Sequence, residues 1–87
     1  MSEYRITFIR SARKELASLD KSTVSRIFSK IEGLSKQPHP RGSRKLEGAA
    51  DLWRIRVGTY RVVYRILDEE LVIEIVGVRH RRDAYRP

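Results

Sequence analysis

The first forty residues show two different periods of hydrophobic and polar positions. Residues 4–8 alternate apolar and polar side chains, which predicts a short strand. Ser11 could cap a first helix over residues 12–19, and Asp20 could cap a second. After Asp20, apolar residues recur at i, i+3, i+4, i+7 and i+10, the spacing of an amphipathic helix; they are Val24, Ile27, Phe28, Ile31 and Leu34. Only a residue or two separates the two predicted helices, so we expect an antiparallel helical hairpin that ends before Pro38.

The chain after residue 51 follows the period of β-strands. Residues 53–57 alternate apolar and basic side chains, and Gly58-Thr59 has the composition of a two-residue hairpin turn. A return strand over residues 60–66 and a further strand from Leu71 to Val78 continue the same apolar face, with a reversal at residues 68–70. These patterns predict an α+β fold in one domain, residues 1–87: an N-terminal strand and a helical hairpin packed on a three- to four-stranded antiparallel sheet.

The composition limits the classes of function. The chain of 87 residues is 40% hydrophobic, enough for one small core and too apolar for a disordered chain. No apolar run exceeds three residues, so we expect neither a membrane span nor a secretory signal, and favour a cytoplasmic protein. The chain has no cysteine and two histidines, which excludes thiolate catalysis and cysteine-ligated zinc. We therefore expect no metal site and no cofactor.

A net charge of +8 gives the first indication of a partner. Fourteen of the 19 basic residues are arginine, and residues 1–40 and 41–87 each carry a net charge of +4. A field of this sign attracts polyanions, and the planar guanidinium group binds phosphate oxygens in pairs. Nucleic acid or an acidic protein is thus the expected partner, although a basic composition can also serve solubility alone.

The arginines of the predicted sheet form a cluster on one face. A turn at Gly58-Thr59 places Arg56 directly opposite Arg61, with Arg54 on the same face. Like charges at opposed positions destabilise a strand pair by roughly 0.2–1 kcal/mol, so a sheet selected only for stability would avoid them. Arg65 shares this face but has Glu74 on the next strand to neutralise it. The pattern offers the other three no such carboxylate, which favours a phosphate-binding face over the alternative that they keep an exposed sheet soluble.

The last residues add groups that could transfer protons. Residues 79–86 contain four arginines with His80 and Tyr85. An imidazole ordinarily exchanges protons near neutral pH, and a tyrosine ring can stack on a base. Either residue alone could equally be a surface or packing residue. Strict alternation would direct Arg79 and Arg81 toward the helices, so we expect the strand to bulge or end before Arg81 faces a substrate.

The combined motifs resemble the RelE/ParE superfamily of toxins from toxin–antitoxin pairs. They are Lys45-Leu46-Glu47-Gly48, the stretch from Leu52 to Ile66 with its Gly-x-Tyr-Arg-Val-Val-Tyr segment, Asp68-Glu69-Glu70, and Val78 to Tyr85. The resemblance covers nearly the whole chain and implies a cognate antitoxin as partner. It favours the RelE branch, whose members cut mRNA in the ribosomal A site through attack of the 2′-hydroxyl on the adjacent phosphate.

The resemblance also implies roles for individual residues. Arg61, His80, Arg81 and Tyr85 match the nuclease positions of RelE-like toxins. The chemistry that the resemblance implies assigns Arg54 and Arg56 to flanking phosphates and Lys45 to a contact with ribosomal RNA. Well-studied members have two lysines where this chain has Arg54 and Arg56. Because arginine effectively cannot lose its proton, we assign the general base to His80 and, second, to Tyr85.

Two other functions stay open. A ParE-like protein would inhibit DNA gyrase without nuclease activity, and a plain RNA-binding module would arrest no growth. The charge pattern alone says only that the chain binds a polyanion.

Overall fold

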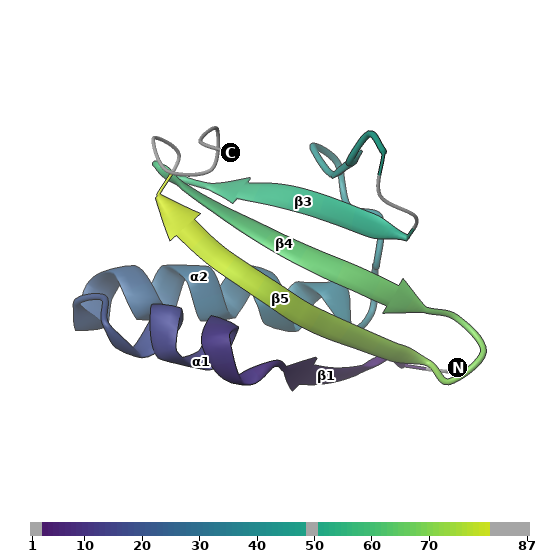
Figure 1. Ribbon diagram of the computed structural model, residues 1–87, viewed down its shortest axis with the longest axis horizontal. Helices are drawn as coiled ribbons and strands as arrows, with labels where there is room; N and C mark the ends of the chain where they lie inside the picture. The colour runs from purple at the N-terminus through teal and green to yellow at the C-terminus, as the bar shows by residue number, and fades with distance from the viewer. Residues whose placement is uncertain (1–2, 49–50, 81–87) are drawn as a thin grey trace.

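A mixed sheet and a helical hairpin make up the computed structural model, which describes residues 3–48 and 51–80 (Figure 1). The elements in chain order are β1 (Arg5–Phe8), α1 (Arg10–Ala17), α2 (Lys21–Leu34), β2 (Arg44–Lys45), β3 (Leu52–Val57), β4 (Tyr60–Leu67) and β5 (Val72–His80). The α+β class, the hairpin and the end of the second helix before Pro38 are confirmed. None of the described helices is long and apolar enough to cross a membrane.

The sheet has five strands, slightly more than the three to four that the sequence pattern predicted. Its five strands lie in the order β1-β5-β4-β3-β2, so that the long β4 and β5 occupy the middle. The N-terminal strand β1 joins the sheet parallel to β5, and the two-residue β2 pairs antiparallel with β3. The sheet is therefore mixed and not wholly antiparallel. Alternation of side chains identifies a strand but not its neighbour, and two residues are too few to show any period.

The expected cap of the first helix is wrong by two positions. Ile9 is the N-cap of α1, and its N–H still donates to the carbonyl oxygen of Ile75 at 3.0 Å, as the last bond of the β1–β5 ladder. The helix thus begins where the strand ends, without a side-chain cap from Ser11. Asp20 is the N-cap of α2, as expected. Its carboxylate accepts hydrogen bonds from Ser22 Oγ at 2.6 Å and Thr23 Oγ1 at 2.5 Å.

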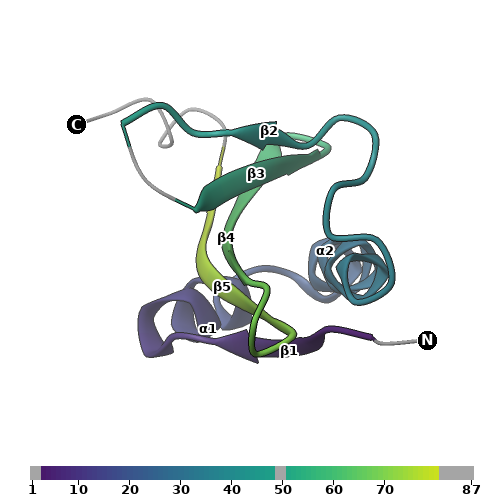
Figure 2. The ribbon, with the colours of Figure 1, turned by 90° about the vertical axis from the view of Figure 1, so that its right-hand side faces the viewer.

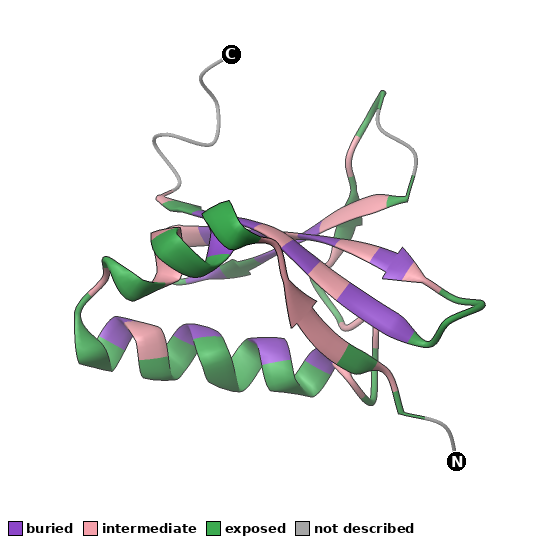
Figure 3. Cartoon of the chain, turned by 60° about the horizontal axis from the view of Figure 1, so that its bottom comes forward, coloured by how far each residue is buried: buried purple, intermediate pink, exposed green. Residues whose placement is uncertain are grey.

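The core lies between the hairpin and one face of the sheet. In α2 the buried residues recur along a single stripe, visible in Figure 3 against the exposed remainder of the helix. Phe28 belongs to the predicted apolar stripe but is 44% exposed, because it lies at the margin of the core edge-on to the ring of Phe8. The core cluster draws buried hydrophobic residues from both layers: Ala12, Ile27, Ile31, Leu34, Ile55, Val57, Val62, Tyr64, Ile66, Ile73, Ile75 and Val78.

An irregularity in β5 decides which side chains share a face. The register changes between Tyr64↔Ile75 and Val63↔Gly77, which leaves Val76 as an extra residue in β5. After this bulge, Val78 lies in the core and Arg79 pairs with Arg61. The expected bulge is confirmed, and it reverses the face that strict alternation would give to Arg79.

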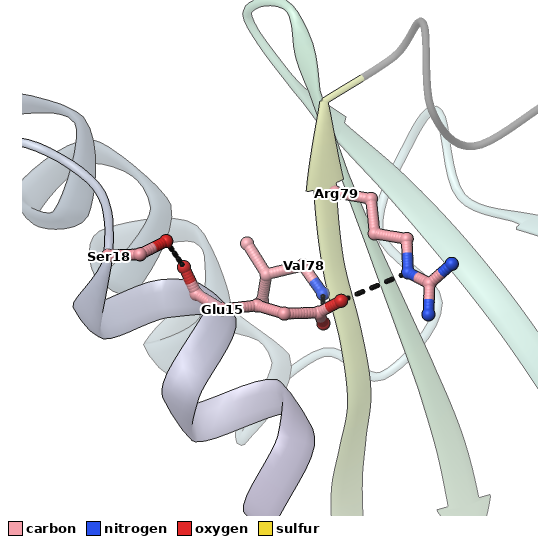
Figure 4. A network of polar contacts seen from close by, with 4 residues as sticks. All are labelled: Glu15, Ser18, Val78 and Arg79. Carbon is pink, nitrogen blue, oxygen red and sulfur yellow. Dashed lines mark hydrogen bonds and ion pairs between the residues drawn. The ribbon is translucent and has the colours of Figure 1, made fainter.

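A carboxylate from α1 secures the strand beyond the bulge (Figure 4). Glu15 Oε1 accepts the backbone N–H of Val78 at 3.0 Å, and Oε2 accepts Nε of Arg79 at 3.1 Å. Strand β1 pairs with β5 only as far as Ile75, so Glu15 binds the N–H of Val78 just past the reach of that ladder. The helix is thereby fixed to the end of the sheet that carries Arg61.

We expect Glu15→Ala to destabilise the fold by about 1–3 kcal/mol, because it removes two hydrogen bonds and leaves the N–H of Val78 without its acceptor. Glu15→Gln keeps one acceptor oxygen and should lose less. Equilibrium urea denaturation measures the change. Glu32→Ala, at an exposed position of α2, is the control, and an equal loss in both alanine variants would contradict this role for Glu15.

The N-cap residue of α2, Asp20, makes the free energy of unfolding depend on pH in the acid range. Hydrogen bonds from Ser22 and Thr23 lower the pKa of Asp20 from 3.8 to about 2. A carboxyl with a lowered pKa in the folded state stabilises the fold above its unfolded pKa of about 3.9, and this contribution is lost as the pH falls toward its folded pKa. We expect the stability difference between wild type and Asp20→Asn to shrink across that interval. Carboxyl NMR titration should show a higher Asp20 pKa in Ser22→Ala, and an unchanged value would disprove the assignment.

Candidate nucleic-acid interface

The sheet face away from the core brings the predicted arginines together. Arg56 lies directly opposite Arg61, and Arg54 lies two residues along β3 on the same face. The directly opposed residues on neighbouring strands are Val63 and Arg44 for Arg54, and Arg79 on the far side of Arg61. In contrast, Arg65 is paired with Glu74, whose Oε1 lies 2.9 Å from Nη1. The predicted register and this ion pair are confirmed.

These three arginines differ in how far they are exposed. Arg54 and Arg61 are each 9% exposed, whereas Arg56 is exposed. Each of the three takes part in interactions within the molecule; one is a hydrogen bond from Nη1 of Arg54 to the carbonyl oxygen of Gly42, at 3.0 Å. An arginine that only kept a surface soluble would extend into water. The burial of Arg54 and Arg61 therefore favours a structured cationic surface over the solubility explanation.

Two further arginines belong to this face and were not among the predicted site residues. The bulge places Arg79 opposite Arg61, so that Arg56, Arg61 and Arg79 form a row across β3, β4 and β5. Strand β2 places Arg44 opposite Arg54. The bulge was expected on account of Arg81 and not of Arg79, and the loop predicted over residues 38–43 ended before Arg44 and gave no signal for it.

His80 and Lys45 lie on the other side of the pleat. His80 is opposite Tyr60, and their rings meet edge to face with centroids 5.3 Å apart. Its imidazole lines a recess of about 400 Å³ with Glu15, Ser18 and Leu19. Lys45 is exposed and opposite Trp53. Since directly opposed residues share a face, neither side chain joins the row of Arg56, Arg61 and Arg79. Arg81 and Tyr85 lie outside the described residues.

The loop that carries Gly42 is fastened to the sheet. Tyr64 Oη donates a hydrogen bond to the carbonyl oxygen of Pro38 at 2.9 Å, and burial raises the pKa of Tyr64. The imidazole of His39 packs edge-on to Trp53, with centroids 4.3 Å apart. These contacts fix the carbonyl that Arg54 binds.

The chemistry available to this face is anion binding. Fixed guanidinium groups at strand spacing can bind successive phosphates and stabilise charge that develops on one of them. Residues 3–48 and 51–80 contain no group of three histidine, aspartate or glutamate residues that could hold a metal ion.

Comparison with known proteins gives a consistent result. The family model described as ParE toxin of type II toxin-antitoxin system, parDE, matches residues 6–85. A protein of Escherichia coli named as a RelE-like toxin is 36% identical over 86 residues, covering 94% of this chain and 90% of the relative. The mRNA interferase toxin RelE of Escherichia coli strain K12 is 29% identical over 86 residues, with coverage of 94% and 90%.

A solved structure shows the same fold with similar coverage. The crystal structure of the archaeal RelE–RelB complex from Pyrococcus horikoshii OT3 aligns with a TM-score of 0.80 at 34% identity, over 91% of this chain and 96% of that chain. The match of the family model spans most of the sequence, and the relatives agree with it in length and fold. The chain therefore belongs to the RelE/ParE superfamily, the toxins of type II toxin–antitoxin systems.

Proposed function

We propose that this toxin is a ribosome-dependent endoribonuclease that cuts mRNA in the A site. The observation that carries the proposal is the arginine row across β3, β4 and β5, in which Arg61 is almost fully buried between Arg56 and Arg79. The relative named mRNA interferase toxin RelE supports the same activity. An antitoxin that covers this face would hold the toxin inactive, in keeping with the solved RelE–RelB complex. Both the ribosome and this antitoxin imply a cytoplasmic site of action.

The reaction requires two proton transfers, one from the attacking 2′-hydroxyl and one to the leaving 5′-oxygen. The 2′-oxygen of the attacked nucleotide loses its proton and bonds to the adjacent phosphorus, and the bond from phosphorus to the 5′-oxygen of the next nucleotide breaks. The leaving oxygen takes a proton, which gives a cyclic phosphate end and a 5′-hydroxyl end. Arg61, with Arg81, stabilises the charge on the phosphorane, and Arg54 and Arg56 hold flanking phosphates. Lys45 contacts ribosomal RNA, and Tyr85 stacks on or orients the attacked nucleotide.

The general base is His80 or Tyr85. An imidazole is suited to accept the 2′-proton near neutral pH. The ring of His80 packs against Tyr60 on the far side of the pleat from Arg61, so its action as base requires it to turn past the end of β5 toward the RNA. Tyr85 is the second candidate.

A gyrase inhibitor is the second candidate function, because the matching family model is that of ParE toxins. Expression of the chain separates the two. A nuclease arrests translation rapidly and leaves cuts inside translated codons, whereas a gyrase inhibitor triggers DNA damage signalling while protein synthesis continues. A plain RNA-binding module would produce neither effect.

We expect Arg61→Ala and Arg81→Ala each to reduce cleavage about 10²- to 10³-fold, since each removes a fixed donor from the phosphorane. Primer extension on mRNA from a translating extract measures the cuts. Arg65→Gln is the matched control, because Arg65 shares the strand and face of Arg61 but is paired with Glu74. Circular dichroism establishes that the variants fold. Cleavage by folded Arg61→Ala at the wild-type rate would remove Arg61 from the mechanism.

A pH profile tests the base. Single-turnover rates are measured across about pH 6–8, and if His80 accepts the proton, His80→Gln loses roughly 10²-fold in rate. Tyr85→Phe measures the alternative in the same assay. An unaltered rate in His80→Gln across the range would exclude His80, and a large loss in Tyr85→Phe alone would assign the base to Tyr85.

A further inference from the structure

A basic groove lies beside the arginine face, around the outer edge of β3. It has a volume of about 610 Å³ and is bounded by the C-terminal half of α2, the loop after it and β3. Figure 2 shows this loop rising from α2 to β2 on the side of the sheet that α2 occupies. Among the residues that the structure describes, no carboxylate lines the groove; the basic residues that line it are Lys30, Arg41, Arg44, Arg54 and Arg56.

Three of these cations distinguish the groove from an ordinary basic surface. Lys30, Arg41 and Arg44 are exposed, and none of them makes an ion pair in the part of the chain that the structure describes. Elsewhere the fold supplies carboxylates to basic side chains, as Glu15 does to Arg79 and Glu74 to Arg65. Like charges around one hollow repel each other, and a bound polyanion would relieve that repulsion.

The walls of the groove are built to hold their shape. The loop wall is fixed by Tyr64 on Pro38, by His39 on Trp53 and by Arg54 on Gly42. Gly33 from α2 and Gly42 from the loop also line the groove, and the space where a Cβ would stand is open at both. A ligand can therefore approach the backbone closely from two sides.

We propose that this groove binds the phosphodiester backbone of RNA as a second site, which adjoins the row of Arg56, Arg61 and Arg79 and shares Arg56 with it. Arg54 and Arg56 belong both to the arginine face and to the groove, so the two cationic surfaces are continuous around β3. Continuity with a face that holds RNA favours RNA over an acidic protein, and in this respect the inference rests on the proposed function. The strand is either mRNA beyond the cleaved nucleotides or ribosomal RNA.

Binding to a labelled single-stranded RNA oligonucleotide with 2′-deoxy nucleotides at the cleavable positions tests the groove without cleavage. On a single strand, each phosphate contact contributes about 0.7 to the slope of log K against log salt. We expect the triple variant Lys30→Gln, Arg41→Gln, Arg44→Gln to lower that slope by about 2 and to weaken binding roughly tenfold or more. The matched control neutralises Arg10, Arg13 and Lys14 on the exposed surface of α1, which changes the net charge equally and should weaken binding far less.

Gly33 allows a second test with little risk to folding. Gly33→Glu places a carboxylate at the groove in open space, and Gly33→Gln places a neutral side chain of the same length there. We expect only the glutamate variant to lose RNA affinity. Equal losses in both triple variants, or equal affinities for Gly33→Glu and Gly33→Gln, would overturn the proposal, as would a wild-type protein that binds no RNA at low salt.

Toxin binding to two ribosome complexes identifies the source of the RNA. One complex carries an mRNA that ends at the A-site codon, and the other carries an mRNA that continues beyond it. Both mRNAs have a 2′-deoxy nucleotide at the cleavage position. A binding defect of the groove variant confined to the long mRNA assigns the groove to mRNA, and an equal defect on both assigns it to ribosomal RNA. A wild-type protein that binds RNA through the groove but leaves ordinary mRNA uncut would disprove the nuclease and not the groove.

Discussion

The pairing of β4 with β5 is the constraint on which the rest of the molecule depends. Side chains of a strand alternate between its two faces, so a shift of one residue exchanges the core face for the solvent face. The extra residue Val76 makes that exchange once, late in β5. Before it, Ile73 and Ile75 are in the core; after it, Val78 is in the core and Arg79 stands beside Arg61. One inserted residue therefore serves both the packing of the core and the assembly of the cationic row.

Some basic side chains of the fold form ion pairs with carboxylates, and others line a basic groove. Glu74 forms an ion pair with Arg65, with Oε1 2.9 Å from Nη1. Glu15 forms an ion pair with Arg79, with Oε2 3.1 Å from Nε. Both bonds also tie elements together, the first across β4 and β5 and the second between β5 and α1. Around the outer edge of β3, by contrast, Lys30, Arg41 and Arg44 line a common groove, and residues 3–48 and 51–80 place no carboxylate in its lining. The ion pairs with carboxylates thus lie away from the groove that we propose binds an anionic RNA strand.

How much of this could be predicted from the sequence depends on the length of each pattern. The α2 stripe and the β3–β4 hairpin extend over several periods, so their element type, the turn at Gly58-Thr59 and the pairing of Arg56 with Arg61 were predicted correctly. The parallel partner of β1 and the two-residue β2 carry no local period and were missed. For the site, register alone brought Arg54, Arg56 and Arg61 together. The faces of His80 and Arg79 depended on where the bulge fell, which no residue pattern locates to a single position.

The Glu15 carboxylate also affects whether a strand of another chain can pair with β5. An uncovered strand margin is a template on which another chain can extend a sheet. Along β5, strand β1 occupies that margin up to Ile75, and Glu15 occupies the N–H of Val78 beyond it. A guest strand can join the sheet at this place only by evicting the carboxylate, and eviction would also release Arg79. A strand that docks at that margin would thus affect the cationic row through Arg79, because the Glu15 carboxylate that binds Arg79 would be displaced.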